Sequence, residues 1–237
     1  MNIDSGNIDG AHGAGQEDIY SVNLGEPIMP SSSGSDVPAK ARPYHHGALR
    51  EALLAAAERL LERDGITGLT LRAAAREAGA SHAAPKNHFD DLTGLLSELA
   101  AVGFNRLSDR LRLAASNQPT EQSKLNAIGF AYVEFAVANP GLFQLMFRGE
   151  RLDSSRPALR KASDESYALL KGAVAAAHSV SQLGGGSLAA AARVARAWTM
   201  VHGYAMLLLD GRLEALFDGG VPALNAPVLL RAMLELE

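Results

Sequence analysis

The amino-acid sequence predicts an all-α fold, because its apolar residues are mostly strong helix formers and recur with helical spacing. Apolar residues make up 47% of the 237 residues but aromatic residues only 5%, so the core must be built mainly from Ala, Leu and Val. Ala and Leu favour helices, and clusters of β-branched residues are nearly absent. The length is enough for a sizeable core and suits one or two domains.

Composition also limits which metal sites the protein can form and which cellular compartment it suits. The chain has no cysteine, which excludes disulfides and thiolate metal sites and fits a reducing compartment. No apolar run approaches the length of a membrane span, and the N-terminus lacks the basic and apolar regions of a secretory signal. No two histidines have the spacing of a metal site on a helix. We therefore expect a cytoplasmic protein with no membrane partner, no metal and no cofactor.

Residues 1–39 differ from the rest of the chain. They are rich in Gly, Ser, Asn and Asp, and they carry six acidic residues without a single Lys or Arg, a charge of −6. The whole chain carries −4, so the remainder carries +2. We interpret this segment as a disordered acidic tail and linker. The overall acidity is therefore weak evidence against nucleic-acid binding, because the negative charge lies on a separable tail.

The chain after the tail begins with a helix from His46 and then a pair of short helices. The first helix has one apolar face and is expected to end near Gly65. That face carries Leu49, Leu53, Ala56 and Leu60. Thr70 has the position of an N-cap for the next helix, and Gly79 the position of a sharp turn. Ser81 is a candidate N-cap for the helix after it.

The two short helices read as a helix-turn-helix, because a turn of three or four residues containing Gly joins them. Pro85 falls near the first turn of the second helix, where a missing N–H costs little and a fixed φ helps. In this motif the start of the second helix faces the bases in the major groove. Asn87 suits adenine, and Lys86 suits guanine or phosphate. The plainer interpretation is that Thr70 and Ser81 only cap helices and that His88 only packs.

The remaining helices are expected to form a second domain. We predict helices at about residues 91–116 and 120–138, a short helix at 142–147, a helix starting at Ser154 or Ser155 with Pro157 near its first position, and helices at 187–210 and 226–237. The helix at 187–210 is apolar on more than one face, so it must be buried on several sides. A partner subunit would cover one of those sides, with the final helix as the second element of the interface.

The stretch from Tyr44 to Phe104 resembles the DNA-binding domain of TetR-family transcriptional repressors. The similarity is carried by "YHHGALR", by "GLTLRAAAREAGAS", by "AAP" and "HF" in the second short helix, and by "GLL" in the helix that follows. The rest of the chain resembles a C-terminal domain marked by a Trp, three residues and then His-Gly, here Trp198, His202 and Gly203.

The resemblance implies three parts: the tail at residues 1–39, a helix-turn-helix domain at 40–95, and a helical effector-binding and dimerisation domain at 96–237. It implies a homodimer that binds a palindromic double-stranded DNA operator and is released by a small-molecule effector. The residues expected to contact DNA are Tyr44, His46, Thr70, Arg72, Ser81, His82, Ala83, Lys86, Asn87 and His88.

Two positions depart from the family pattern. Lys86 stands where the family commonly has a Tyr that touches phosphate, and Leu92 stands where it usually has a Lys that contacts the DNA backbone. Asp90 and Asp91 add negative charge nearby. We therefore expect modest affinity for DNA with a shallow salt dependence. Lys40 and Arg42, in the arm before the first helix, offer compensating contacts in the minor groove.

The effector cavity is expected among bulky residues of the second domain. An apolar pocket with a few polar groups is typical of small-molecule sites, although any one such residue, taken alone, is more often ordinary core. The candidate residues are Phe130, Phe143, Phe147, Tyr167, His178, Trp198 and His202.

The sequence argues against an enzyme and leaves one alternative function open. The chain lacks G-x-S-x-G, lacks G-x-x-x-x-G-K-[ST] and lacks metal-ligand spacing, so we do not expect an enzyme. A helical interaction protein, derived from such a regulator but with weakened or lost DNA binding, remains the alternative. Repressor and activator stay open, since the sign of regulation depends on where the operator lies.

Overall fold

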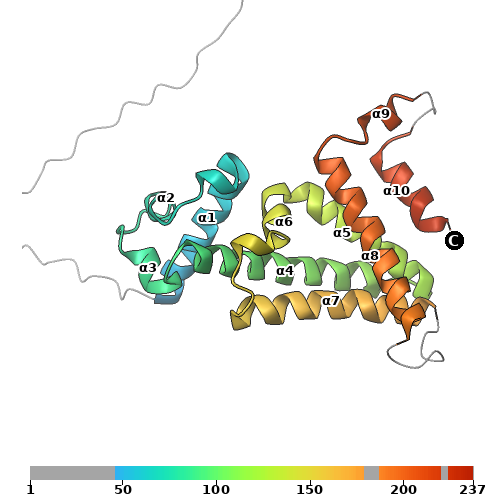
Figure 1. Ribbon diagram of the computed structural model, residues 1–237, viewed down its shortest axis with the longest axis horizontal. Coiled ribbons are helices and arrows are strands. Elements are labelled where there is room, and N and C mark those ends of the chain that lie inside the picture. The colour runs from blue at the N-terminus through green and yellow to red at the C-terminus, as the bar shows by residue number, and fades with distance from the viewer. Residues whose placement is uncertain (1–45, 179–186, 220–223, 237) are drawn as a thin grey trace, which may run out of the picture. The chain divides into compact units, whose positions relative to one another are not determined.

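The computed structural model describes residues 46–178, 187–219 and 224–236, and within these ranges every regular element is a helix (Figure 1). The side chains are described from Ala48 onward. The elements are α1 (His46–Gly68), α2 (Leu71–Glu77), α3 (Ala84–Phe89), α4 (Leu92–Ser116), α5 (Glu121–Ala138), α6 (Pro140–Met146), the 3-10 turn η1 (Gly149–Arg151), α7 (Pro157–Ala177), α8 (Leu188–Leu209), α9 (Glu214–Phe217) and α10 (Ala226–Glu235). The expected tail at residues 1–39 lies outside the described residues.

The helix-turn-helix expected from the sequence is formed by α2 and α3. The side chain of Thr70 caps α2, accepting a hydrogen bond from the Ala73 N–H at 3.0 Å. Gly79 turns the chain with a φ of 65°, a conformation that suits glycine. The first helix is interrupted where predicted, because Gly65 has a φ of 68° and a ψ of −179° inside α1. These three predictions are confirmed.

The start of α3 differs from the sequence prediction. Ser81 as a side-chain N-cap is wrong: α3 begins at Ala84, its N-cap is Ala83, and no side chain caps it. The carbonyl of Ser81 instead accepts from the Ala84 N–H at 3.0 Å, which closes a turn before the helix. Pro85 does lie in the first turn of α3, as predicted, and is buried there.

The later helices begin mostly at side-chain caps. Asp91 caps α4 through the Gly94 N–H at 2.7 Å, Thr120 and Ser123 form a capping box on α5, and Ser187 caps α8. For α7, Pro157 lies at the first position as predicted, but the start at Ser154 or Ser155 is wrong, because Arg156 is the N-cap residue and makes no side-chain cap. Ser155, which precedes it, hydrogen-bonds the side chain of Asp153 instead.

The long helix α4 connects the two functional parts of the chain. It packs against α1 and α3 at its start and against α5, α6 and α7 along its length. The expected domain boundary between residues 95 and 96 falls inside this continuous helix. The core around it is aliphatic, with fully buried Leu95, Leu99 and Leu107 joined by Phe89 from α3 and Phe143 from α6. A shift of α4 would therefore change its packing against both α3 and the later helices.

Candidate functional sites

Helix α3 buries one face and exposes the other. Ala84, Pro85 and Phe89 form the buried face, and Phe89 is fully buried. The exposed side chains at and before the helix start are those of Ser81, His82, Ala83, Lys86 and Asn87. The two faces follow from helical spacing, because residues four apart lie on the same side. Polar groups thus stand on a helix whose underside is fixed in the core.

Two further candidates lie on or beside α3. His88 is half-buried, with its ring 6.1 Å from the ring of Phe89 between centroids. Tyr44 and the side chain of His46 lie outside the described residues. The side chain of Thr70 is exposed but already accepts the capping hydrogen bond from Ala73.

Helix α2 adds positive charge to this part of the surface. Arg72 is exposed, as is Arg76 one turn later on the same face of the helix. Within the described residues neither arginine forms an ion pair with a carboxylate, and neither does Lys86. Arg76 was not among the residues predicted to contact DNA. Its spacing of four from Arg72 is the signal that could have identified it.

The junction between α3 and α4 is unusually tight. Asp90 has a φ of 67° and a ψ of −60°, and it is the one non-glycine residue with positive φ in the described parts of the chain. The N–H of Asp91 donates to the carbonyl oxygen of Phe89 at 2.8 Å, which closes a three-residue turn around Asp90. Such a γ-turn with positive φ is rare and strained, so neighbouring contacts must hold it in place.

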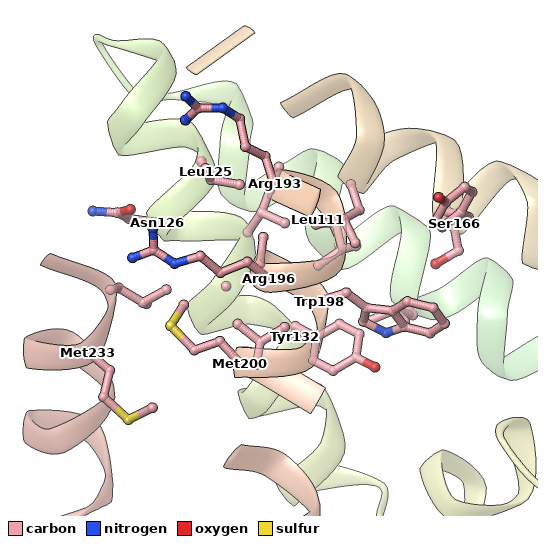
Figure 2. Close-up of a pocket in the computed structure, with 18 of the residues that line it drawn as sticks. Leu111, Leu125, Asn126, Tyr132, Ser166, Arg193, Arg196, Trp198, Met200 and Met233 are labelled. Carbon is pink, nitrogen blue, oxygen red and sulfur yellow. The ribbon is translucent and has the colours of Figure 1, made fainter. Parts of the chain in front are cut away.

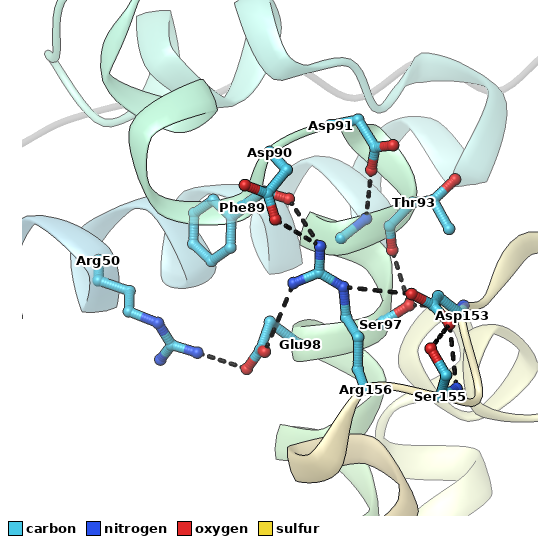
Figure 3. Close-up of polar contacts among 11 residues, drawn as sticks. Arg50, Phe89, Asp90, Asp91, Thr93, Ser97, Glu98, Asp153, Ser155 and Arg156 are labelled. Carbon is cyan, nitrogen blue, oxygen red and sulfur yellow. Dashed lines mark hydrogen bonds and ion pairs between the residues drawn. The ribbon is translucent and has the colours of Figure 1, made fainter.

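Arg156 supplies those contacts from the start of α7 (Figure 3). Its Nη2 donates to the carbonyl of Phe89 at 3.1 Å and to Oδ2 of Asp90 at 2.8 Å. The same guanidinium lies 4.0 Å from a carboxylate oxygen of Glu98 and 3.8 Å from one of Asp153. A single half-buried side chain from the C-terminal part of the protein therefore fixes the end of α3.

Glu98 continues this network back to the first helix. Its carboxylate accepts a hydrogen bond from Arg50 of α1, and the Arg50 guanidinium stands 5.6 Å from the centroid of the Phe89 ring. Ser97 joins α4 to the same segment, since its Oγ accepts from the Asp153 N–H at 2.8 Å. The end of α3 is thus surrounded by polar contacts from α1, α4 and the chain before α7 (Figure 3).

The second candidate site is a cavity of about 510 Å³ among the C-terminal helices. Side chains of α4, α5, α7, α8 and α10 line it, together with Phe147 at the end of α6. Four of the seven residues expected around an effector are among the lining residues, namely Phe147, Tyr167, His178 and Trp198. The volume falls within the roughly 300–1,000 Å³ typical of small-molecule pockets.

The other three expected residues are not among those that line the cavity. Phe143 is fully buried in the core. Phe130 is half-buried, and the guanidinium of Arg231 stands 5.2 Å from the centroid of its ring. The ring of His202 lies 4.6 Å from that of Phe147 and 6.2 Å from that of Trp198 between centroids, and both of these residues line the cavity.

His202 holds a lining residue in position. Its Nδ1 lies 2.9 Å from the hydroxyl oxygen of Tyr132, which lines the cavity. Burial lowers the pKa of His202 and raises the pKa of the Tyr132 hydroxyl. At neutral pH the tyrosine hydroxyl therefore shares this hydrogen bond with an uncharged imidazole. This geometry makes His202 a positioning residue for the aromatic wall.

One side of the cavity is polar. Arg193 and Arg196 project from the first half of α8, near Leu125 and Asn126 of α5, whereas Trp198 and Ser166 lie on the other side (Figure 2). Sequence reasoning did not identify either arginine as a cavity residue. Exposed arginines on an amphipathic helix ordinarily indicate a solvated face, and only the packing of α5 against α8 places them at the cavity.

The described residues form neither a membrane-spanning helix nor a metal site. None of their helices is long and apolar enough to cross a membrane. They contain no group of three or more His, Cys, Asp or Glu side chains placed to hold a metal ion.

Comparison with known proteins agrees with this architecture. Residues 125–224 match the family model of the tetracyclin repressor-like C-terminal domain. A protein of unknown function from Rhodococcus sp. RHA1 is 36% identical, with a TM-score of 0.67 over 82% of this chain and 96% of that one. A putative TetR-family transcription regulator from Shewanella sp. PV-4 is 17% identical, with a TM-score of 0.57 over 78% of this chain and 95% of that one.

A curated relative is similar over a shorter stretch. It is an uncharacterized HTH-type transcriptional regulator, YobS, of Bacillus subtilis (strain 168), 26% identical over 98 residues. The match covers 41% of this chain and 51% of the relative, so the chain spans about half the length of that protein. The chain therefore has the fold of TetR-family transcription regulators and carries a tetracyclin repressor-like C-terminal domain.

Proposed function

We propose that this protein is a dimeric, DNA-binding transcriptional regulator of the TetR type, most simply a repressor released from a palindromic operator by a small molecule. The observation that carries the proposal is the two-sided helix α3. Its buried face, with Phe89, fixes the helix, while Lys86 and Asn87 face outward where a major groove would lie. Action on operator DNA would place the protein in the cytoplasm.

The charges around α3 favour binding to a polyanion. Arg72, Arg76 and Lys86 are exposed and lack an acidic partner within the described residues. The two nearby acids are engaged, because Asp90 pairs with Arg156 and Asp91 caps α4. Their negative charge is therefore partly offset, and the side chains of Arg72, Arg76 and Lys86 can contact DNA phosphates.

The departure at Leu92 has a packing explanation. Leu92 is half-buried and packs against the core, so this position contributes apolar contact where the family usually has a Lys. One phosphate contact per subunit is consequently lost. We expect a salt dependence shallower than that of a regulator with a lysine there, because each phosphate contact contributes to the slope.

Release by an effector would use the cavity and α4. Phe104, Leu107 and Leu111 of α4 line the cavity, and the capped start of the same helix abuts the end of α3. An effector that binds one position of α4 better than another would shift the population between a DNA-binding and a released arrangement. We assign the C-terminal domain to the Trp-His-Gly type on Trp198, His202 and Gly203, the first of which lines this cavity.

The test is a fluorescence-anisotropy titration against the DNA that flanks the protein's own gene, at two salt concentrations. Asn87→Ala should weaken binding by about 1–3 kcal/mol and relax the preference at one base pair. Lys86→Ala should weaken binding to all sequences alike and lower the salt slope by about one unit per subunit. Lys171→Ala, an exposed lysine on α7, serves as the matched control and should bind as wild type.

The alternative is a helical interaction protein that no longer binds DNA. The departures at Lys86 and Leu92 are the observations that favour it. Saturable binding to a palindrome, weakened in both α3 variants but not in Lys171→Ala, would establish the regulator. A folded helical dimer that binds no flanking fragment would instead support the interaction protein.

A further inference from the structure

The polar side of the cavity carries two positively charged hydrogen-bond donors, the guanidinium groups of Arg193 and Arg196. Arg193 and Arg196 stand three residues apart on α8, which places them on neighbouring positions of one face. Neither forms an ion pair with a carboxylate in the described part of the chain. Figure 2 shows their side chains extending toward Leu125 and Asn126, away from Trp198. Two exposed guanidinium groups without an ion-pair partner therefore share one side of a mostly apolar space.

The amide of Asn126 adds a third donor. Its Oδ1 accepts a hydrogen bond from Nε2 of Gln122 at 3.0 Å, so the acceptor side of the amide is already engaged. The Nδ2 group remains to donate. Both residues line the cavity, one turn apart on α5. This side thus presents two cations and an amide N–H₂ to whatever enters between α5 and α8.

The opposite side of the cavity is aromatic. Phe147 stands edge-on to Phe104 with 5.6 Å between ring centroids, and Trp198 lies 6.1 Å from Tyr167 and 6.5 Å from Phe147. Asp164 is the carboxylate among the described lining residues, and it lies one turn before Tyr167 on α7. It forms no ion pair with either arginine. The cavity is therefore divided into an anion-attracting side and a side that favours rings or hydrocarbon.

From this division we infer that the effector is an amphipathic anion: an apolar body lies against Trp198 and Phe147, and a carboxylate is held by Arg193 and Arg196. Guanidinium groups match the planar geometry of a carboxylate and bind it through paired hydrogen bonds. The inference rests on the proposed effector site and adds the chemical class of its ligand. A neutral molecule of the same shape would leave both guanidinium groups without a partner.

The test uses two fluorescent probes with the same ring system. Anilinonaphthalene sulfonate carries an anionic group, and phenylnaphthylamine is its neutral counterpart. Trp198 is the only tryptophan in the sequence and lines the cavity, so energy transfer from it to a probe reports occupancy of this site. Dodecanoate and dodecanol then compete with the bound probe, which compares a carboxylate with an alcohol on the same hydrocarbon chain.

We expect the sulfonate probe to bind more tightly than the neutral one, and dodecanoate to displace it better than dodecanol. Arg193→Gln and Arg196→Gln should each weaken sulfonate binding roughly tenfold, which is 1.4 kcal/mol, and leave the neutral probe unchanged. Arg212→Gln changes an exposed arginine outside the cavity and should have no effect. Circular dichroism establishes that each variant is folded.

The possible failures are distinguishable. Equal affinity for both probes, unchanged in the arginine variants, would overturn anion recognition while leaving an effector cavity in place. Absence of energy transfer to either probe would overturn the cavity as a ligand site, and with it both this inference and release by an effector. Neither result would bear on DNA binding by α3, which the anisotropy titration tests separately.

Discussion

Gly94 shows how closely α4 approaches the end of α3. A Cβ atom at this position would lie 1.9 Å from the carbonyl oxygen of Phe89 and 2.5 Å from Nη2 of Arg156. Real Cβ atoms do not approach backbone oxygen at such a distance, so any side chain here would push the γ-turn at Asp90 away from α4. The absence of a side chain is therefore what allows Arg156 to reach the Phe89 carbonyl.

We predict that Gly94→Ala lowers the free energy of unfolding by about 1–3 kcal/mol, the usual cost of forcing extra volume into a packed site. Gly172→Ala is the matched control, because nothing lies within 4 Å of a Cβ there and the residue is inside α7. That control should instead be stabilised by about 0.5–1 kcal/mol. Urea unfolding of both variants measures the difference. Equal stabilities would mean that the α3–α4 junction accommodates the added methyl group without a loss of unfolding free energy.

Residue-level predictions from the sequence succeeded where the cause was local. Thr70 and Asp91 cap their helices because an N-cap needs only a side-chain oxygen two or three residues before a free N–H. Ser81 has the same chemistry but lies two residues before the N-cap position, and a turn before α3 uses its carbonyl instead. The contact between Arg156 and Asp90 spans 66 residues, and nothing in the local sequence indicates such a pairing.

At the scale of helices, α4 and α7 form the connection between the cavity and α3. The two helices pack along much of their length, and arginine side chains bridge them at two places. Near the start, Arg156 bridges to the α3–α4 junction with its side chain only 21% exposed. Farther along, Arg112 of α4 pairs with Glu165 of α7, but its side chain is 48% exposed. The two bridges share a residue type and differ in burial, which allows a direct comparison.

We predict that Arg156→Ala costs about 1–3 kcal/mol of stability, because the Phe89 carbonyl loses a charged donor and the partly buried carboxylate of Glu98 loses an ion-pair neighbour. Arg112→Ala should cost less than about 0.5 kcal/mol, as is usual for an exposed pair. Hydrogen exchange at residues 89–95 should accelerate in the first variant only, and its affinity for DNA should fall. Identical exchange in the two variants would show that Arg156 does not fix the end of α3.

The long helices could be predicted because their apolar periodicity and their end signals agree. The predicted ranges 91–116 and 120–138 each exceed α4 and α5 by one residue, the N-cap. The range 187–210 exceeds α8 by one residue at each end, the N-cap and the C-cap. The short elements α9 and η1 were not predicted, because three or four residues carry no period. The cavity could be predicted only in part. The sequence shows that Phe147 and Trp198 have large side chains, but it does not show which face of each side chain lines a cavity.

At the scale of the whole molecule, α8 and α10 expose large apolar side chains. Leu207 on α8 is 46% exposed, and Val228 and Leu236 at the last helix are 48% and 71% exposed. Nothing lies within 4 Å of a Cβ at Gly203, although glycine costs stability inside a helix. A second copy packed by two-fold symmetry would cover the same patch on both chains. A close approach of the two chains at Gly203 would then explain why this position has no side chain.

We predict that Ala195→Glu, two turns before Gly203 on an exposed face of α8, disrupts the dimer by burying a charge at its interface. Light scattering should report the mass of one chain for this variant and of two chains for wild type. Ala168→Glu, the same substitution at an exposed position of α7, should remain dimeric. Because one chain offers a single α3, the monomer should also lose about half the salt slope of DNA binding. A dimeric Ala195→Glu variant with unchanged DNA binding would place the interface elsewhere and leave the apolar surface of α8 and α10 without this explanation.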